Sequence, residues 1–165
     1  GDSNVAAIGF QCLNNYGIKM HLRADGYFGI GGLSSTAWKW YLNAAGDMTT
    51  AGDLIAYSDP RLKDDVELID GAIDIVNKLD GVRFTWNNRS ALIANKTGKR
   101  DIGVLADQVK AVLPEAVSET LKDVETGETY LGVAYEKLVP VLIEAIKELS
   151  KKVEVLTEKV ERNGD

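Results

Sequence analysis

The chain has 165 residues, of which 45% are hydrophobic and 27% are charged, and its formal net charge is −6. This length fits one ordinary domain, or a small domain with an extended arm. The acidic balance argues against nucleic acid or an anionic membrane surface as the main partner, and no apolar run is long enough to span a bilayer. With one cysteine and one histidine, the chain offers neither an internal disulfide framework nor an obvious zinc site, so we expect no metal and no cofactor.

The composition changes sharply near residue 57. Residues 1–57 hold nine of the 16 glycines, eight of the twelve aromatic residues and only seven charges. Residues 58–165 hold the other 37 charges and all three prolines. We therefore predict an α+β chain in two parts, a β-rich arm over residues 1–57 and a charged mixed domain over residues 58–165.

The arm is expected to consist of short strands separated by glycine and Asn/Asp turns. Strands are predicted over residues 6–10, 17–22, 27–30 and 38–42, with a turn at 24–26. The arm has few aliphatic residues with which to fill a core of its own, so it would be marginal as a monomer. Burial against copies of itself, or against a longer parent protein, would remedy this. The arm is therefore interpreted as the end of an oligomeric β-structure.

The second part alternates between helical and strand periodicity. Its helices are indicated by apolar residues on one helical face, and its strands by alternation of apolar and polar residues. The predicted elements, in chain order, are a helix over 69–79, a strand over 82–86, a loop over 87–100, a strand over 102–105, a helix over 106–113 and a hairpin over 124–133.

The clearest periodic signal lies in a helix predicted over about residues 136–162. Its apolar residues are spaced 4, 3, 4, 3, 4, an a/d heptad seam with Leu at d and Ile or Val at a. The outer positions, Glu148, Lys151 and Lys152 among them, are almost all charged, and this narrow apolar stripe favours a coiled-coil seam over packing on its own domain. The pattern alone favours two strands and does not specify a trimer. The seam residues are Leu142, Ile146, Leu149, Val153, Leu156 and Val160.

Most familiar motifs are missing or weak. The glycines at 29–32 lack a Walker lysine and a following helix, so they are interpreted as turn residues. His21 is the only imidazole and is expected to be an ordinary packed or exposed histidine. Trp38, Trp40 and Tyr41 could form a platform on which sugars stack, although aromatic residues in such a pattern are more often core or interface residues.

A short polar segment at the junction of the two parts has two interpretations. In the first it is a linker in which Asp59 caps a helical turn that Pro60 opens. In the second, Ser58 is a nucleophile and Lys63 its general base. A serine hydroxyl is a weak nucleophile until a neighbouring group takes its proton, and a neutral lysine can do so. Desolvation or the nearby Arg61 would favour a neutral lysine, whereas pairing with neighbouring aspartates would oppose it. The spacing of Ser58 and Lys63 does not by itself decide between the two.

The sequence Ser58-Asp59-Pro60-Arg61-Leu62-Lys63 resembles the Ser-Asp-x-Arg-Leu-Lys signature of the endosialidase-type C-terminal intramolecular chaperone. This family is a self-cleaving domain that ends many phage tailspikes, tail fibres and neck appendages. Three further blocks match in order, at residues 81–86, 102–115 and 135–149. The resemblance covers about residues 56–160.

The resemblance implies how the two parts work together. Three copies assemble into an intertwined homotrimer, and the small mixed domain with its coiled-coil helix helps the preceding β-fibre, residues 1–57, to trimerise. The chain then cuts itself, and residues 58–165 leave. The implied location is the virion, with assembly in the host cytoplasm, and the implied partners include neither nucleic acid nor a membrane.

The resemblance also assigns the residues of the cut. Ser58 is the nucleophile, Lys63 is the base, and the bond that is cleaved joins Tyr57 to Ser58. The domain is then a single-turnover serine endopeptidase with a Ser-Lys dyad. The residues assigned a supporting role in the motif are Asp59, Arg61 and Leu62.

Two other functions remain open at this stage. The chain could be a structural trimerisation module that keeps the signature without cutting. Alternatively, residues 1–57 could be a receptor- or glycan-binding fibre tip.

Overall fold

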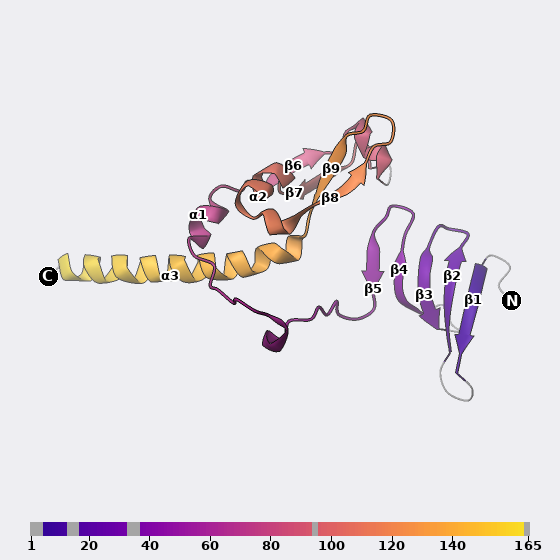
Figure 1. The fold of residues 1–165 in the computed structure, drawn as a ribbon, viewed down its shortest axis with the longest axis horizontal. Helices are drawn as coiled ribbons and strands as arrows, with labels where there is room; N and C mark the ends of the chain where they lie inside the picture. Colours follow the sequence, from indigo (N-terminus) through magenta and orange to yellow (C-terminus); the bar gives the residue numbers. More distant parts are fainter. Residues whose placement is uncertain (1–4, 13–16, 33–36, 94–95, 164–165) are drawn as a thin grey trace. The chain divides into compact units, whose positions relative to one another are not determined.

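The computed structural model describes residues 5–12, 17–32, 37–93 and 96–163, and every predicted site residue lies within these ranges. An N-terminal antiparallel sheet is followed by a small mixed body and a long C-terminal helix, which confirms the predicted α+β class (Figure 1). Contacts group the chain into two units. The first unit comprises residues 1–63 with 86–98, and the second comprises residues 64–85 with 99–165.

The first unit is built on one five-stranded sheet in which each strand pairs antiparallel with the next. The four predicted strands are confirmed, while β5 was not predicted because three residues are too few to show alternation. At the turn between β2 and β3, Gly26 has a φ of 85°, a conformation that glycine adopts without a steric penalty. The strands are β1 (Val5–Gln11), β2 (Gly17–Arg23), β3 (Phe28–Gly32), β4 (Trp38–Leu42) and β5 (Met48–Thr50).

The register of the strands sorts their side chains onto two unlike faces. One face, here called the apolar face, carries Ala6, Ile8, Phe10, Ile18, Met20, Leu22, Phe28, Ile30, Trp40, Leu42, Met48 and Thr50. The opposite face, here called the polar-aromatic face, carries Ala7, Lys19, His21, Arg23, Gly29, Gly31, Trp38, Tyr41 and Thr49. A register shift between Ile30 and Gly31 places Trp38 and Trp40 on opposite faces, although they are two residues apart in one strand.

Within its described residues, the second unit contains three α-helices and two separate two-stranded sheets, β6–β7 and β8–β9. Two elements differ in length from the sequence prediction. The helix predicted over 69–79 covers only Ala72–Val76. The hairpin predicted over 124–133 begins earlier, because its first strand is Val117–Lys122 and residues 123–128 form the turn. The elements are α1 (Ala72–Val76), β6 (Val82–Thr85), β7 (Arg100–Gly103), α2 (Ala106–Val112), β8 (Val117–Lys122), β9 (Thr129–Val133) and α3 (Leu138–Asn163).

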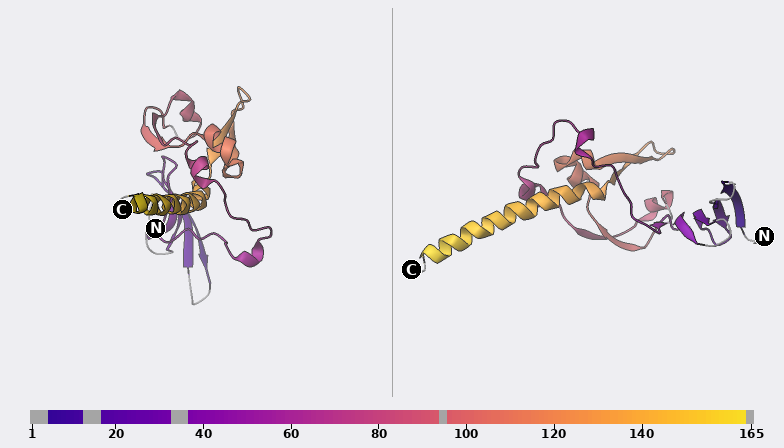
Figure 2. Two further views of the ribbon diagram at one scale, coloured as in Figure 1. Left: turned by 90° about the vertical axis from the view of Figure 1, so that its left-hand side faces the viewer. Right: turned by 90° about the horizontal axis from the view of Figure 1, so that it is seen from below.

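The principal core of the second unit lies where α3 packs on α1. Val141 and Ala145 of α3 are buried against Ala72 of α1, and Ile69, Ile73 and Leu113 are among the residues packed around them. The helix α3 continues beyond this contact as one uninterrupted helix (Figure 2). Its first turns are therefore anchored to the body, while its later turns project from it.

The heptad seam lies on α3 beside the buried stripe rather than within it. Val141 is 2% exposed, whereas the adjacent Leu142 is 47% exposed. The six seam residues are all exposed, by 47% to 71%, and they continue past the end of the contact with α1. The helix thus packs on its own domain with one face and leaves a second apolar stripe uncovered.

Candidate functional site

A single 3-10 turn organises the segment that carries the Ser-Asp-x-Arg-Leu-Lys motif. The turn covers Pro60–Leu62, with Asp59 as its N-cap and an extended residue, Lys63, at its end. The Asp59 carboxylate accepts a hydrogen bond from the Arg61 backbone N–H at 2.9 Å, and the Asp59 carbonyl accepts one from the Leu62 N–H at 3.1 Å. The capping role expected for Asp59 and the helical turn opened by proline are both present.

This turn brings Ser58 and Lys63 together. The Lys63 Nζ lies 3.0 Å from the Ser58 Oγ and donates a hydrogen bond to it. Both residues are exposed, and Tyr57, on the other side of the predicted cleavage point, is 97% exposed. A general base must lie within hydrogen-bond reach of the proton that it removes, and this distance meets that requirement.

Asp59 and Arg61 form the charged support of the turn. Arg61 Nη2 lies 2.7 Å from Asp59 Oδ2, and Arg61 Nε donates to Asp59 Oδ1 at 3.0 Å. The hydrogen bonds from the Arg61 side chain and then from its backbone N–H lower the pKa of Asp59. Asp59 is thus paired with Arg61 and not with Lys63. Leu62, in the same turn, is 70% exposed.

The aromatic residues of the sheet do not form the single platform that their sequence suggested. Trp38 stacks on His21 with ring centroids 4.0 Å apart and lies 5.5 Å from Tyr41, whereas Trp40 packs edge-on to Phe28 on the apolar face. His21 is 2% exposed, and neither of its ring nitrogens has a hydrogen-bond partner within the described part of the chain. His21 therefore packs against Trp38 and makes no hydrogen bond to the residues around Ser58.

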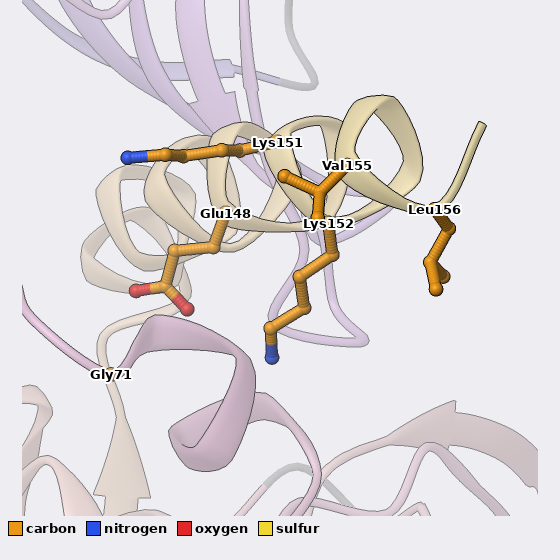
Figure 3. A pocket seen from close by; sticks show the side chains of 6 residues that line it. All are labelled: Gly71, Glu148, Lys151, Lys152, Val155 and Leu156. Carbon is orange, nitrogen blue, oxygen red and sulfur yellow. The ribbon is translucent and has the colours of Figure 1, made fainter. Parts of the chain in front are cut away.

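Glu148 has a role that the sequence did not predict. It was assigned to the charged outer face of the C-terminal helix, but its carboxylate accepts hydrogen bonds from the backbone N–H groups of Ala72 at 2.8 Å and Ile73 at 3.1 Å. Figure 3 shows the side chain directed from α3 toward Gly71 at the start of α1. These backbone hydrogen bonds, from Ile73 first and then Ala72, lower the pKa of Glu148. The sequence carries no signal of this contact, because it exists only when α3 packs beside the start of α1.

A second unpredicted contact joins two of the sequence blocks. Tyr135 Oη accepts a hydrogen bond from the Val104 N–H at 3.3 Å, and it lies against Gly103, where an added Cβ would come within 2.6 Å of it. Residue 103 must therefore be glycine, because a side chain there would clash with Tyr135 of the later block. This contact fixes the start of α3 relative to the end of β7.

Over the ranges that the structure describes, no group of three or more His, Cys, Asp or Glu side chains is arranged to hold a metal ion. Over the same ranges, no helix is long and apolar enough to cross a membrane.

Comparison with known proteins supports the resemblance that the motif at residues 58–63 carries. Residues 58–118 match the family described as chaperone of endosialidase, which confirms the resemblance predicted from the sequence. The match begins at Ser58 and includes the motif at residues 58–63 and the blocks at residues 81–86 and 102–115. The block at residues 135–149 lies beyond it.

Two relatives come from bacteriophages. Over 80 residues the chain is 35% identical to the long tail fiber protein Gp37 of Enterobacteria phage K3, and equally to the protein of that name in Enterobacteria phage T2. Each alignment covers 42% of this chain and 6% of the relative. The chain thus spans a small fraction of the length of these two relatives.

Proposed function

We propose that this chain is an intramolecular chaperone of a phage tail fibre, which gathers three copies through α3 and then releases residues 58–165 by cutting the bond between Tyr57 and Ser58. The observation that carries the proposal is the 3.0 Å contact between Lys63 Nζ and Ser58 Oγ at the start of the family match. The chaperone role is supported by the family match and by the two tail fibre relatives.

The proposed cut proceeds by an acyl shift within the chain. Lys63, as the neutral amine, takes the proton from Ser58 Oγ, and the oxygen attacks the carbonyl carbon of Tyr57. The C–N bond breaks, the amino group of Ser58 takes up the proton, and Tyr57 is left as an ester on Ser58 Oγ. Water then hydrolyses the ester, which gives a carboxylate at Tyr57 and restores the Ser58 hydroxyl.

Asp59 and Arg61 act in this proposal as positioning residues. Their ion pair and the backbone hydrogen bond to the Asp59 carboxylate hold the 3-10 turn that returns Lys63 toward Ser58. Because Arg61 engages Asp59, this carboxylate does not draw the Lys63 ammonium away from the serine.

Assembly would prepare the site for reaction. Ser58 and Lys63 are exposed in the single chain, and removal of water favours the neutral form of an amine. Neighbouring copies that cover the segment would exclude water from it, so we expect cleavage to follow assembly. Once the chaperone has left, refolding is no longer simply the reverse of unfolding, and the fibre gains kinetic stability.

The helix α3 supplies the means of assembly. Its seam residues are exposed and continue past the contact with α1, so they are available to pack against the same helix of other copies. A trimerisation module that does not cut itself would use the same seam. Only cleavage at Ser58 distinguishes the self-cleaving chaperone from such a module.

The test is the intact mass of the purified full chain and of its variants. Wild type is expected to yield fragments 1–57 and 58–165, and Ser58→Ala to remain whole. Lys63→Ala removes the general base and is expected to slow cleavage by roughly 10²- to 10⁴-fold. Lys63→Arg, which keeps the charge but supplies no neutral amine at this pH, should behave like Lys63→Ala.

Matched controls replace an exposed serine and an exposed lysine elsewhere, Ser118→Ala and Lys122→Ala, which should cleave like wild type. If the assembled wild type stays whole, the cleavage proposal is wrong and the assembly function stands alone. If Lys63→Arg cuts at the wild-type rate, a base other than Lys63 is at work.

A further inference from the structure

The five-stranded sheet has no core of its own. The five buried hydrophobic residues in the described part of the chain, Ala72, Val109, Ala116, Val141 and Ala145, all belong to the second unit. Stable domains bury a sheet against a second layer, because a single layer leaves one hydrophobic face in water. The sheet β1–β5 is a single layer with such a face.

The apolar face is exposed across the whole width of the sheet. Ile8 on the first strand is 64% exposed, Leu22 on the second is 49% exposed, and Met48 on the last is 58% exposed. Charged side chains of the central strands, such as Lys19 and Arg23, lie on the other face. Strands about 4.8 Å apart and about 20 Å long make a face of roughly 480 Å², which is in the range of the largest apolar patch of a typical monomer, a patch that is often functional.

We infer that the apolar face of the β1–β5 sheet is the surface through which copies of this chain pack on one another, with the polar-aromatic face turned outward to solvent. This inference rests on the proposed assembly function and specifies which surface of the arm the chaperone brings together. In the proposed trimer, the occupants of the apolar face are the same faces of the other two copies of the chain.

Two observations select a second copy over another partner. The side chains of the face carry no charge and all but Thr50 are apolar, so a complementary surface must itself be apolar, and the chain supplies one in its own copies. The exposed seam of α3 would also hold copies together, which raises the effective concentration of one sheet for another. Sheets that pack through their apolar faces interdigitate their inner side chains.

The experiment measures the reactivity of cysteines placed on the two faces of one strand. The background is the full chain with Ser58→Ala, to keep it whole, and Cys12→Ser, to remove the native thiol. Met48→Cys reports on the apolar face, and Thr49→Cys, its neighbour in β5, reports on the opposite face. The probe is a maleimide of low molecular mass, and the oligomeric state of each variant is measured by sedimentation velocity.

In the assembled chain, Met48→Cys is expected to react at least about tenfold more slowly than Thr49→Cys, because buried thiols react only when the structure opens. Addition of Leu149→Lys to the α3 seam separates the copies, after which the two cysteines should react at similar rates. The pair Ile8→Cys and Ala7→Cys, on the two faces of β1 at the other edge, should give the same result.

Each other outcome overturns part of the reasoning in a distinguishable way. If the chain is assembled but both cysteines of a pair react fast, the face is not the interface, and assembly through α3 still stands. If Met48→Cys stays protected in the separated Leu149→Lys chain, another segment of the same chain covers the face. If the chain is a monomer at every concentration, both the assembly function and the interface are wrong.

If assembly persists with Leu149→Lys, the seam is not what holds the copies, and the sheet can be tested by itself. Met48→Lys should then dissociate the copies, whereas Thr49→Lys should not. Equal effects of these two lysines would overturn the interface.

Discussion

Truncation of two adjacent residues of α3 separates packing within one chain from packing between chains. Val141 is buried against α1, while the neighbouring Leu142 belongs to the heptad seam and is 47% exposed. Val141→Ala removes two methyl groups from the core, at about 0.8 kcal/mol each, and with the cavity term the expected loss is about 2 kcal/mol per chain. This loss falls on the body and does not depend on protein concentration.

Leu142→Ala acts instead on the association. Full burial of a leucine contributes about 2 kcal/mol, so the exposed half of Leu142 leaves about 1 kcal/mol per chain to be gained in an assembly. In the proposed trimer, three chains together lose about 3 kcal/mol, which weakens the association by roughly 100-fold. Alanine is the better helix former, so the helix itself is not weakened.

The assay is sedimentation equilibrium together with urea unfolding over a 100-fold range of protein concentration. Leu142→Ala should move the concentration at which copies separate, and Val141→Ala should lower the unfolding midpoint equally at all concentrations. The reasoning is refuted if Leu142→Ala leaves the association unchanged, or if Val141→Ala alters the association while leaving the stability of the body intact.

Two further substitutions test contacts within the second unit. Gly103→Ala would place a Cβ 2.6 Å from Tyr135 Oη and should destabilise the chain by about 1–3 kcal/mol in thermal unfolding. Tyr135→Phe in the same chain should recover part of this loss, and a lack of recovery would contradict the clash. Because the folded-state pKa of Glu148 is lowered, its contribution to stability is present above its ordinary value of 4.5 and is lost as the pH falls through the folded-state value. Glu148→Gln should therefore lower the urea midpoint at pH 7 and flatten the decline below pH 4.5, whereas the exposed Glu154→Gln should match wild type at both.

Much of the local structure could be predicted because local signals agree with it. The strands of the sheet follow from alternation and glycine turns, and the long helix follows from its heptads, with predicted limits within two residues of those observed. The prediction for α1 was too long because Ile69 and Leu79 have helical spacing, but Ile69 packs on the core from an irregular segment and Leu79 lies half-buried beyond the end of the helix. The first strand of the β8–β9 hairpin was missed because polar residues dominate it.

The candidate site was also predicted in part. The motif at residues 58–63 named Ser58 and Lys63, and the capping preference of Asp59 with Pro60 predicted the turn between them. The distance between the two side chains could not be read from the spacing, since five residues in an extended chain would hold them far apart. It depends on the 3-10 turn and on the Asp59–Arg61 pair that supports it.

By itself the sequence determined most strands of the arm, the long C-terminal helix, and that the arm could not build a core alone. Only the tertiary structure decided which surfaces those elements present. The register shift at Ile30 and Gly31 turns Trp38 and Trp40 to opposite faces, because one extra residue in a strand reverses every side chain beyond it. Likewise, Glu148 belongs to the charged side of α3 by sequence, but the packing of α3 on α1 brings its carboxylate to two backbone N–H groups more than 70 residues away.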